Sequence, residues 1–263
     1  MKNLFRFNFT KETAVAFAAG AVMITLSLLM LPFMGASLFD KIASFVLRDL
    51  LMIFGLGVVF VSLYVERNKD GLRAIGFTGK RNVLSLLLNI LFAAGLLAMF
   101  LKEDRPQGIW EAKNLYAAAY ILVAGVFEMT FIYGYLRACF EKAFGIVPAI
   151  FLTAAFYSFH HAGFQPEFLH LFFVGLMYSA VYYITQNLLM IFPFFWGVGA
   201  LWDVIVSSKA GEEIKNFESF AIALALLCLS GIWIIVVRRN KLSLPRLTRQ
   251  SESSRKRLSG QAR

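Results

Sequence analysis

Charged residues are scarce in this 263-residue chain. Only 16% of the residues are charged and 59% are apolar, and the mean hydropathy is +0.68. Soluble domains carry about 25% charged and about 45–50% apolar residues. The composition therefore excludes a soluble globular protein. It predicts an all-α membrane protein, since a helix satisfies its backbone groups within the hydrocarbon.

Cysteine and the common hydrolase signatures are also scarce or missing. The two cysteines, Cys139 and Cys228, lie in apolar runs and are interpreted as small buried residues. The sequence contains no H-E-x-x-H zinc motif and no G-x-S-x-G nucleophile elbow. Classical zinc-protease and serine-hydrolase sites are thus disfavoured.

Long apolar runs are abundant instead. About eight segments can span roughly 30 Å of hydrocarbon at about 20 residues each. They cover approximately residues 13–36, 43–65, 82–101, 116–140, 144–163, 166–185, 187–207 and 219–238. The sequence predicts one polytopic membrane domain of about eight transmembrane helices over residues 1–240. A basic tail, 241–263, is expected to be disordered and to lie against anionic lipid.

The basic residues are distributed unevenly between the two ends of these spans. Nineteen Lys and Arg residues fall on the side that holds both termini, six fall on the other side, and Arg48 lies within a span. Because positive residues mark the cytoplasmic side, both termini are predicted to be cytoplasmic. The basic tail and compact size suit a bacterial inner membrane. The net charge of +10 is read as a topology signal, and no nucleic-acid partner is expected.

A few ionisable residues remain inside the spans. Glu128 stands in the apolar stretch "VFEMTFIYGYLRACFEKAFG", and His160, Asp203 and the pair Arg48–Asp49 also fall within spans. The topology places most of them in the outer half of the bundle, with Glu128 roughly 15–18 Å below the outer face. Such residues are costly in lipid and by default indicate a functional site. The alternative is that they pair with each other to hold helices together.

The same residues form an ordered set of motifs. "FEMTFIYGYLRACFEKAFG" resembles the first signature of the CPBP family of intramembrane endopeptidases, which includes CAAX proteases, and Glu128 matches its first glutamate. "FYSFH", with Phe156 and His160, resembles the F-x-x-x-H signature on the next span. "ITQNLLMIFPFFWGVGALWDVI" resembles the third element, with Asp203 as its final acid. The resemblance covers roughly residues 66–207.

This resemblance implies roles for the matched positions. The first glutamate would activate water with help from the second-signature histidine, so the implied catalytic residues are Glu128, His160 and Asp203. The chain departs from the pattern at Met129, at Tyr133 and at Gly199, where the family has a histidine that stabilises the oxyanion. Because one lost oxyanion donor costs about 100–1,000-fold in rate, another donor is needed. The candidates are Tyr133, His161, His170 and Arg48.

Two functions follow as expectations. The first is a membrane endopeptidase that cleaves a membrane-embedded or lipid-anchored protein. The second is a catalytically degenerate relative that binds and regulates a membrane partner. No cofactor is expected. A metal held by three of Glu128, His160, His161, His170 and Asp203 is kept as an alternative.

Overall fold

The computed structural model describes residues 4–103, 111–161, 167–188 and 217–243. Every regular element in these ranges is helical, which confirms the predicted all-α fold. The longer elements are α1 (Lys11–Leu29), α4 (Asn82–Glu103), α5 (Ala112–Phe127), α7 (Ile146–His160), α8 (Phe168–Thr185), α10 (Phe217–Ser243) and the π-helices η2 (Phe45–Phe60) and η4 (Glu128–Leu136). The shorter ones are η1 (Leu31–Phe33), α2 (Leu38–Ser44), α3 (Val61–Arg67), η3 (Gly71–Ile75) and α6 (Arg137–Phe144).

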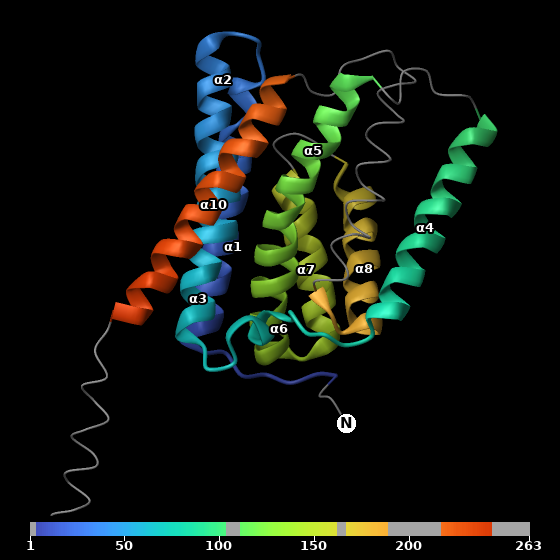
Figure 1. Cartoon of the computed structure of the whole chain (residues 1–263). Helices are drawn as coiled ribbons and strands as arrows, with labels where there is room; N and C mark the ends of the chain where they lie inside the picture. Colours follow the sequence, from blue (N-terminus) through green and yellow to red (C-terminus); the bar gives the residue numbers. More distant parts are fainter. Residues whose placement is uncertain (1–3, 104–110, 162–166, 189–216, 244–263) are drawn as a thin grey trace, which may run out of the picture.

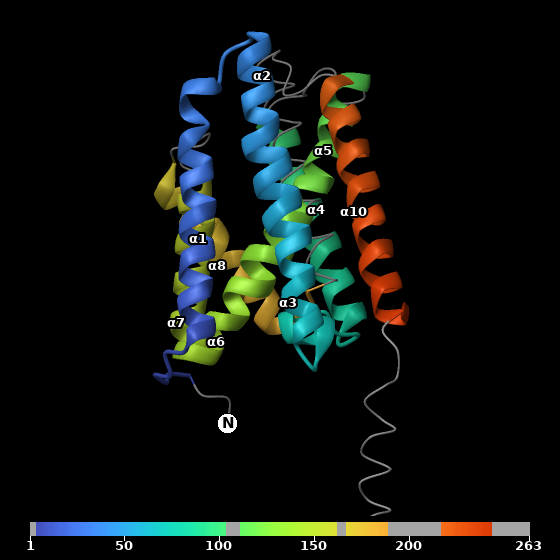
Figure 2. The ribbon, with the colours of Figure 1, turned by 90° about the vertical axis from the view of Figure 1, so that its left-hand side faces the viewer.

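Several of these elements follow one another without a break and form longer continuous helices. α2, η2 and α3 form one run, and α5, η4 and α6 form another (Figures 1 and 2). Five helices of the described chain are long and apolar enough to cross a membrane: Lys11–Phe33, Leu38–Arg67, Ala118–Phe144, Phe168–Thr185 and Phe220–Arg239. The protein is therefore an integral membrane protein.

The predicted count of eight spans stays a prediction. The segments predicted at 82–101 and 144–163 correspond to the helices α4 and α7, and α7 is apolar but shorter than the five. Nearly all of the predicted span 187–207 lies outside the described residues. α10 runs to Ser243, so the helix extends past the predicted start of the tail at residue 241. The tail from residue 244 onward also lies outside the described residues.

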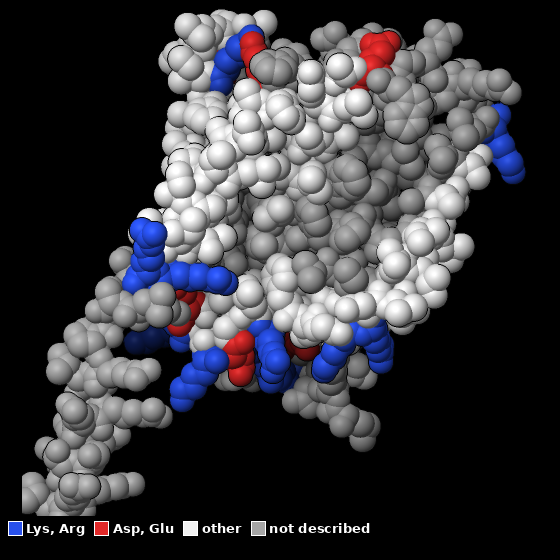
Figure 3. All heavy atoms as spheres, viewed as in Figure 1, with Lys and Arg blue, Asp and Glu red and all other residues white. Residues whose placement is uncertain are grey.

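The two ends of the bundle agree with the sidedness predicted from charge. The amino-terminal segment, η3, the end of α6 and the end of α10 all lie at the lower end in Figure 1. α2 and the start of α5 lie at the upper end. Described Lys and Arg residues gather along that lower edge (Figure 3). Which end faces the cytoplasm remains a prediction.

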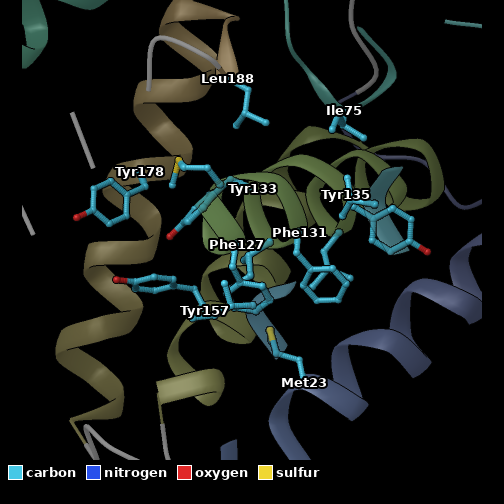
Figure 4. Packing of buried hydrophobic residues seen from close by; sticks show 14 of the residues in the cluster. Met23, Ile75, Phe127, Phe131, Tyr133, Tyr135, Tyr157, Tyr178 and Leu188 are labelled. Atoms are coloured by element: carbon cyan, nitrogen blue, oxygen red, sulfur yellow. The ribbon is translucent and has the colours of Figure 1, made fainter. Parts of the chain in front are cut away.

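The continuous helix formed by α5, η4 and α6 lies at the centre of the bundle. In the most apolar 18-residue stretch of its span, Ala118–Phe144, 67% of the residues are buried, whereas 11% are buried in the corresponding stretch of Phe220–Arg239. Its buried aromatic residues, among them Phe127, Phe131 and Tyr135, point into a core that receives Met23 from α1 (Figure 4). Each such side chain buries about 150–250 Å². The helix that carries Glu128 is thus held on all sides by other helices.

Small residues set the closest helix contacts. A Cβ atom added at Gly175 of α8 would lie 2.9 Å from the Cα atom of Ala154 in α7. A Cβ atom added at Gly57 of η2 would lie 2.9 Å from the Cα atom of Phe127. Neither position has room for a side chain without a backbone shift.

Candidate active site

Glu128 is the first residue of the π-helix η4 and faces the end of α7. Its carboxylate is buried: 8% of the residue is exposed. Single π-helical turns are frequent at functional sites because the wider i→i+5 turn changes which side chains share a face. Burying a carboxylate in apolar surroundings is costly unless polar groups face it. The polar groups that face Glu128 come from His160 and His161.

His160 is the last residue of α7 and makes the shortest contact with Glu128. The His160 Nε2 atom lies 3.1 Å from the Glu128 Oε1 atom, and His160 is only 3% exposed. An ionised carboxylate can only accept hydrogen bonds. His160 therefore carries its proton on Nε2 when Glu128 is ionised. The pairing of these two residues agrees with the sequence resemblance.

His161 approaches the same carboxylate oxygen from the adjacent position. Its Nε2 atom lies 3.5 Å from Glu128 Oε1, and its Nδ1 atom lies 2.8 Å from the Tyr157 carbonyl oxygen. A carbonyl oxygen only accepts, so Nδ1 is the donor in that bond. In the neutral ring, Nε2 then presents a lone pair toward Glu128. His161 is the one sequence-predicted supporting residue that the described structure brings into contact with Glu128.

Three residues that position this pair were not found from the sequence. The Ser27 hydroxyl of α1 donates to the His160 carbonyl oxygen. The Phe127 ring meets the His160 ring edge-on with centroids 5.5 Å apart, and the Tyr157 ring meets the His161 ring at 4.6 Å. In the sequence, Ser27 is only one hydroxyl residue in an apolar run. Nothing in the sequence distinguishes Phe127 and Tyr157 from the chain's other Phe and Tyr residues, of which there are 28 and nine in all.

Phe156 has a packing role. Its ring stacks on Phe140 of α6 with centroids 5.4 Å apart and lies 6.0 Å from the Phe17 ring. It also covers Gly20 of α1, where an added Cβ atom would lie 2.4 Å from the Phe156 ring. Phe156 therefore docks α7 against α1, one helical turn before His160.

Tyr133 lies on the same helix as Glu128, one π-turn further on. It is fully buried, and its ring packs against Tyr157 and Tyr178 at centroid distances of 5.6 and 5.7 Å (Figure 4). Among the described residues, neither the Tyr133 hydroxyl nor Glu128 Oε2 has a hydrogen-bond partner. A buried hydroxyl without such a partner remains available to a bound molecule.

Arg48 belongs to a separate network. Its guanidinium donates to both carboxylate oxygens of Asp49, at 2.9 and 3.0 Å, and lies 5.1 Å from the centroid of the Tyr120 ring. The Tyr120 hydroxyl donates to the same Asp49 carboxylate. Tyr120 precedes Glu128 by eight residues, or about 12 Å along the helix. The alternative that Arg48 and Asp49 pair with each other to hold helices together describes this network better.

The remaining predicted residues have no described contact with Glu128. His170 lies in the first turn of α8, and its side chain is exposed. Asp203, and Gly199 at the position of the missing histidine, lie outside the described residues. Their predicted places in the site stay predictions.

The three residues at the centre of the site could also hold a metal ion. Glu128, His160 and His161 each offer one ligand atom, and these atoms lie within 4.8 Å of one another. Two imidazole nitrogens and one carboxylate oxygen form a donor set that catalytic zinc accepts, with the fourth position left for water. The expectation of no cofactor is not tested by this geometry.

Comparisons with known proteins bear on the central part of the chain. Residues 110–206 match the family model described as type II CAAX prenyl endopeptidase Rce1-like, and they include Glu128, His160 and Asp203. No curated protein and no solved structure matches the chain. The matched segment is a little over a third of the chain and overlaps the resemblance found from the motifs. Residues 110–206 are therefore similar to the Rce1-like type II CAAX prenyl endopeptidases, which confirms the resemblance to the CPBP family found from the motifs.

Proposed function

We propose that this protein is an intramembrane endopeptidase in which Glu128 activates the attacking water. The contact between Glu128 Oε1 and His160 Nε2, at 3.1 Å within the bundle, is the observation that carries the proposal. A general base must lie within hydrogen-bond reach of the proton that it takes. Glu128 Oε2 accepts no hydrogen bond from the described residues, which supports its role as the oxygen that takes this proton.

Each of the three central residues has its own role in the proposed hydrolysis. His160 donates from Nε2 to Glu128 Oε1 and fixes the carboxylate. A water that donates one O–H to Glu128 Oε2 and the other to Nε2 of His161 directs its oxygen lone pair toward the substrate. Glu128 takes a proton from this water as the new C–O bond forms. The proton passes to the amide nitrogen as the C–N bond breaks, which releases an amine and a carboxylic acid.

The developing oxyanion needs a donor because Gly199 lacks the family's imidazole. Tyr133 is the described residue best suited to this task. Its hydroxyl is buried and has no hydrogen-bond partner among the described residues. Its ring packs against the ring of Tyr157, whose carbonyl oxygen orients His161. Donors held in a water-poor site act more strongly than donors in water. Asp203 is proposed as a second contributor on the strength of the resemblance.

The substrate class follows from the depth of the site. Glu128 lies ten residues into the candidate span Ala118–Phe144, or about 15 Å from the start of that span, which lies toward the upper end in Figure 1. A peptide bond reaches that depth only when its chain is embedded in the membrane or anchored to it by lipid. We propose that the upper end is the outer face and that both termini are cytoplasmic, as the charge distribution favours.

The test compares purified wild type with Glu128→Gln in liposomes that contain fluorogenic membrane peptides. The amide keeps the shape of the side chain and removes the base, so turnover should fall by about 100- to 10,000-fold. Glu167→Gln is the matched control, since it makes the same change on an exposed side chain. Wild-type turnover in Glu128→Gln would overturn the assignment of the base.

The alternative function is a catalytically degenerate protein that binds a membrane partner. The replacement at Gly199 is the observation that favours it. In that case Glu128→Gln and wild type would both lack turnover on every peptide, and site-specific crosslinking in cells from position 133 would capture the same membrane protein in both.

A further inference from the structure

A second polar site lies at the opposite end of the central helix. A cavity of about 370 Å³ opens where α6, α8, η3 and the amino-terminal segment meet. Its lining includes Arg6, Arg73, Arg137, Glu141, Lys142 and Tyr182. It belongs to the lower edge in Figure 3, where the described Lys and Arg residues gather.

The cavity lies at the level of the membrane–water interface. Lys142 is two residues from the end of the candidate span Ala118–Phe144, and Arg6 precedes the span Lys11–Phe33 by five residues. Both flanking positions mark the boundary between hydrocarbon and lipid head groups. Any ligand of this cavity therefore meets the protein at the depth of lipid phosphates.

Two of the four cations are neutralised within the protein. Arg137 is 3% exposed, pairs with Glu141 at 2.7 Å and lies 3.9 Å from the centroid of the Tyr182 ring. Lys142 pairs with Glu12 at 3.2 Å. These contacts hold the two side chains in the lining of the cavity.

The other two cations lack a carboxylate partner in the described structure. Arg6 and Arg73 have exposed side chains, and neither forms an ion pair with any described residue. The cavity thus keeps an excess of about two positive charges. This excess complements one phosphate group, which carries one to two negative charges.

The cavity is built before any ligand arrives. The backbone N–H of Arg6 donates to the Phe144 carbonyl oxygen at 2.9 Å, which ties the amino-terminal segment to the end of α6. Arg137 donates to the Ile75 carbonyl oxygen at 3.3 Å, which ties η3 to the same helix. A preformed wall lowers the ordering cost of binding.

We propose that this cavity binds a phosphate group, as carried by the head group of an anionic lipid. Guanidinium groups present paired N–H donors that match phosphate oxygens. Basic pockets between transmembrane helices at the head-group level are suited to phosphate-bearing lipids. The volume lies at the lower end of the range for small-molecule sites, about 300–1,000 Å³.

This site is separate from the proposed peptidase site. Arg137 follows Glu128 by nine residues, so the two lie about 13 Å apart along the helix. Binding can therefore be measured without turnover, and its failure would leave the endopeptidase proposal untouched.

The experiment measures equilibrium binding of fluorescent phosphatidylglycerol and of fluorescent diacylglycerol, which carries no phosphate, to the full chain in neutral detergent, with and without inorganic phosphate. The variant is Arg6→Gln/Arg73→Gln. The control, Lys69→Gln/Lys80→Gln, removes two exposed cations elsewhere along the loop that follows α3. The first variant should weaken phosphatidylglycerol binding by about 10- to 30-fold, and the control should change it less than about twofold.

The outcomes separate the sources of the phosphate. Phosphatidylglycerol binding that persists in inorganic phosphate identifies a lipid ligand, whereas saturable binding of inorganic phosphate that displaces the lipid identifies a soluble one; both support the phosphate site. Equal affinity for the two lipids together with no binding of inorganic phosphate would overturn it. An equal loss in the two double variants would also overturn it, since that result reports surface charge alone.

Discussion

The close approach between η2 and the central helix predicts that one remote glycine controls both stability and turnover. A Cβ atom at Gly57 would lie 2.9 Å from the Cα atom of Phe127 and 3.0 Å from its Cβ and Cδ2 atoms. Gly57→Ala must therefore move backbone or the Phe127 ring. Overpacking of this kind costs about 1–3 kcal/mol of folding free energy.

The same displacement reaches the site through two short steps. Phe127 precedes Glu128 in the chain, and its ring packs edge-on against the His160 ring. A shift of about 1 Å in a catalytic group costs up to about 100-fold in rate. We therefore expect Gly57→Ala to lower the turnover of fluorogenic membrane peptides by about 10- to 100-fold per folded molecule.

The assay pairs unfolding titrations in one detergent with turnover in liposomes. Gly231→Ala in α10 is the matched control, because an added Cβ atom there meets nothing within 4 Å among the described residues. The control should unfold at the same midpoint denaturant concentration as wild type or at a higher one, since Ala favours the helix over Gly by about 1 kcal/mol. A Gly57→Ala protein with wild-type stability and turnover would refute the close contact and its link to Glu128.

Three further predictions separate structural from chemical roles. Arg48→Met should destabilise the fold by about 3 kcal/mol because it leaves the buried Asp49 carboxylate unpaired, while turnover per folded molecule stays at the wild-type level; a selective loss of turnover would return Arg48 to the site. Lys41→Met, which breaks the exposed pair with Glu218, should cost less than about 1 kcal/mol in the same titration. Turnover should also survive 1,10-phenanthroline and EDTA, since the proposed base needs no metal. Chelator-sensitive turnover that zinc restores would instead assign Glu128, His160 and His161 as metal ligands.

The contact between Glu128 and His160 could be expected from the sequence because the resemblance to the CPBP family implies it. The resemblance pairs the first-signature glutamate with the second-signature histidine, and the two side chains meet at 3.1 Å. The pairing of Arg48 with Asp49 was likewise visible, since they are adjacent charges inside one span. In both cases the high cost of an isolated charge in lipid leaves few arrangements open.

The supporting contacts could not be predicted in the same way. The hydrogen bond from the Ser27 hydroxyl to the His160 carbonyl oxygen joins residues 133 positions apart, and it depends on how α1 packs against α7. The tautomer of His161 is set by the Tyr157 carbonyl, and backbone carbonyls leave no mark on the sequence. The π-helical register at Glu128 has no compositional signature either. Such features are fixed by packing, which short-range patterns do not record.

The long separation between Ser27 and His160 also bears on how the protein is made. The chain emerges from the ribosome amino-terminal end first, so α1 enters the membrane well before α7 exists. Two backbone hydrogen bonds of the amino-terminal segment also form late in synthesis. The Asn8 N–H donates to the Ala143 carbonyl oxygen, and the Leu4 carbonyl oxygen accepts from the Val147 N–H. Contacts of such long range close late, after their loop entropy has been overcome. The nascent protein therefore lacks the contact between Glu128 and His160 until α7 is inserted, so the proposed site forms only after more than half of the chain has been made.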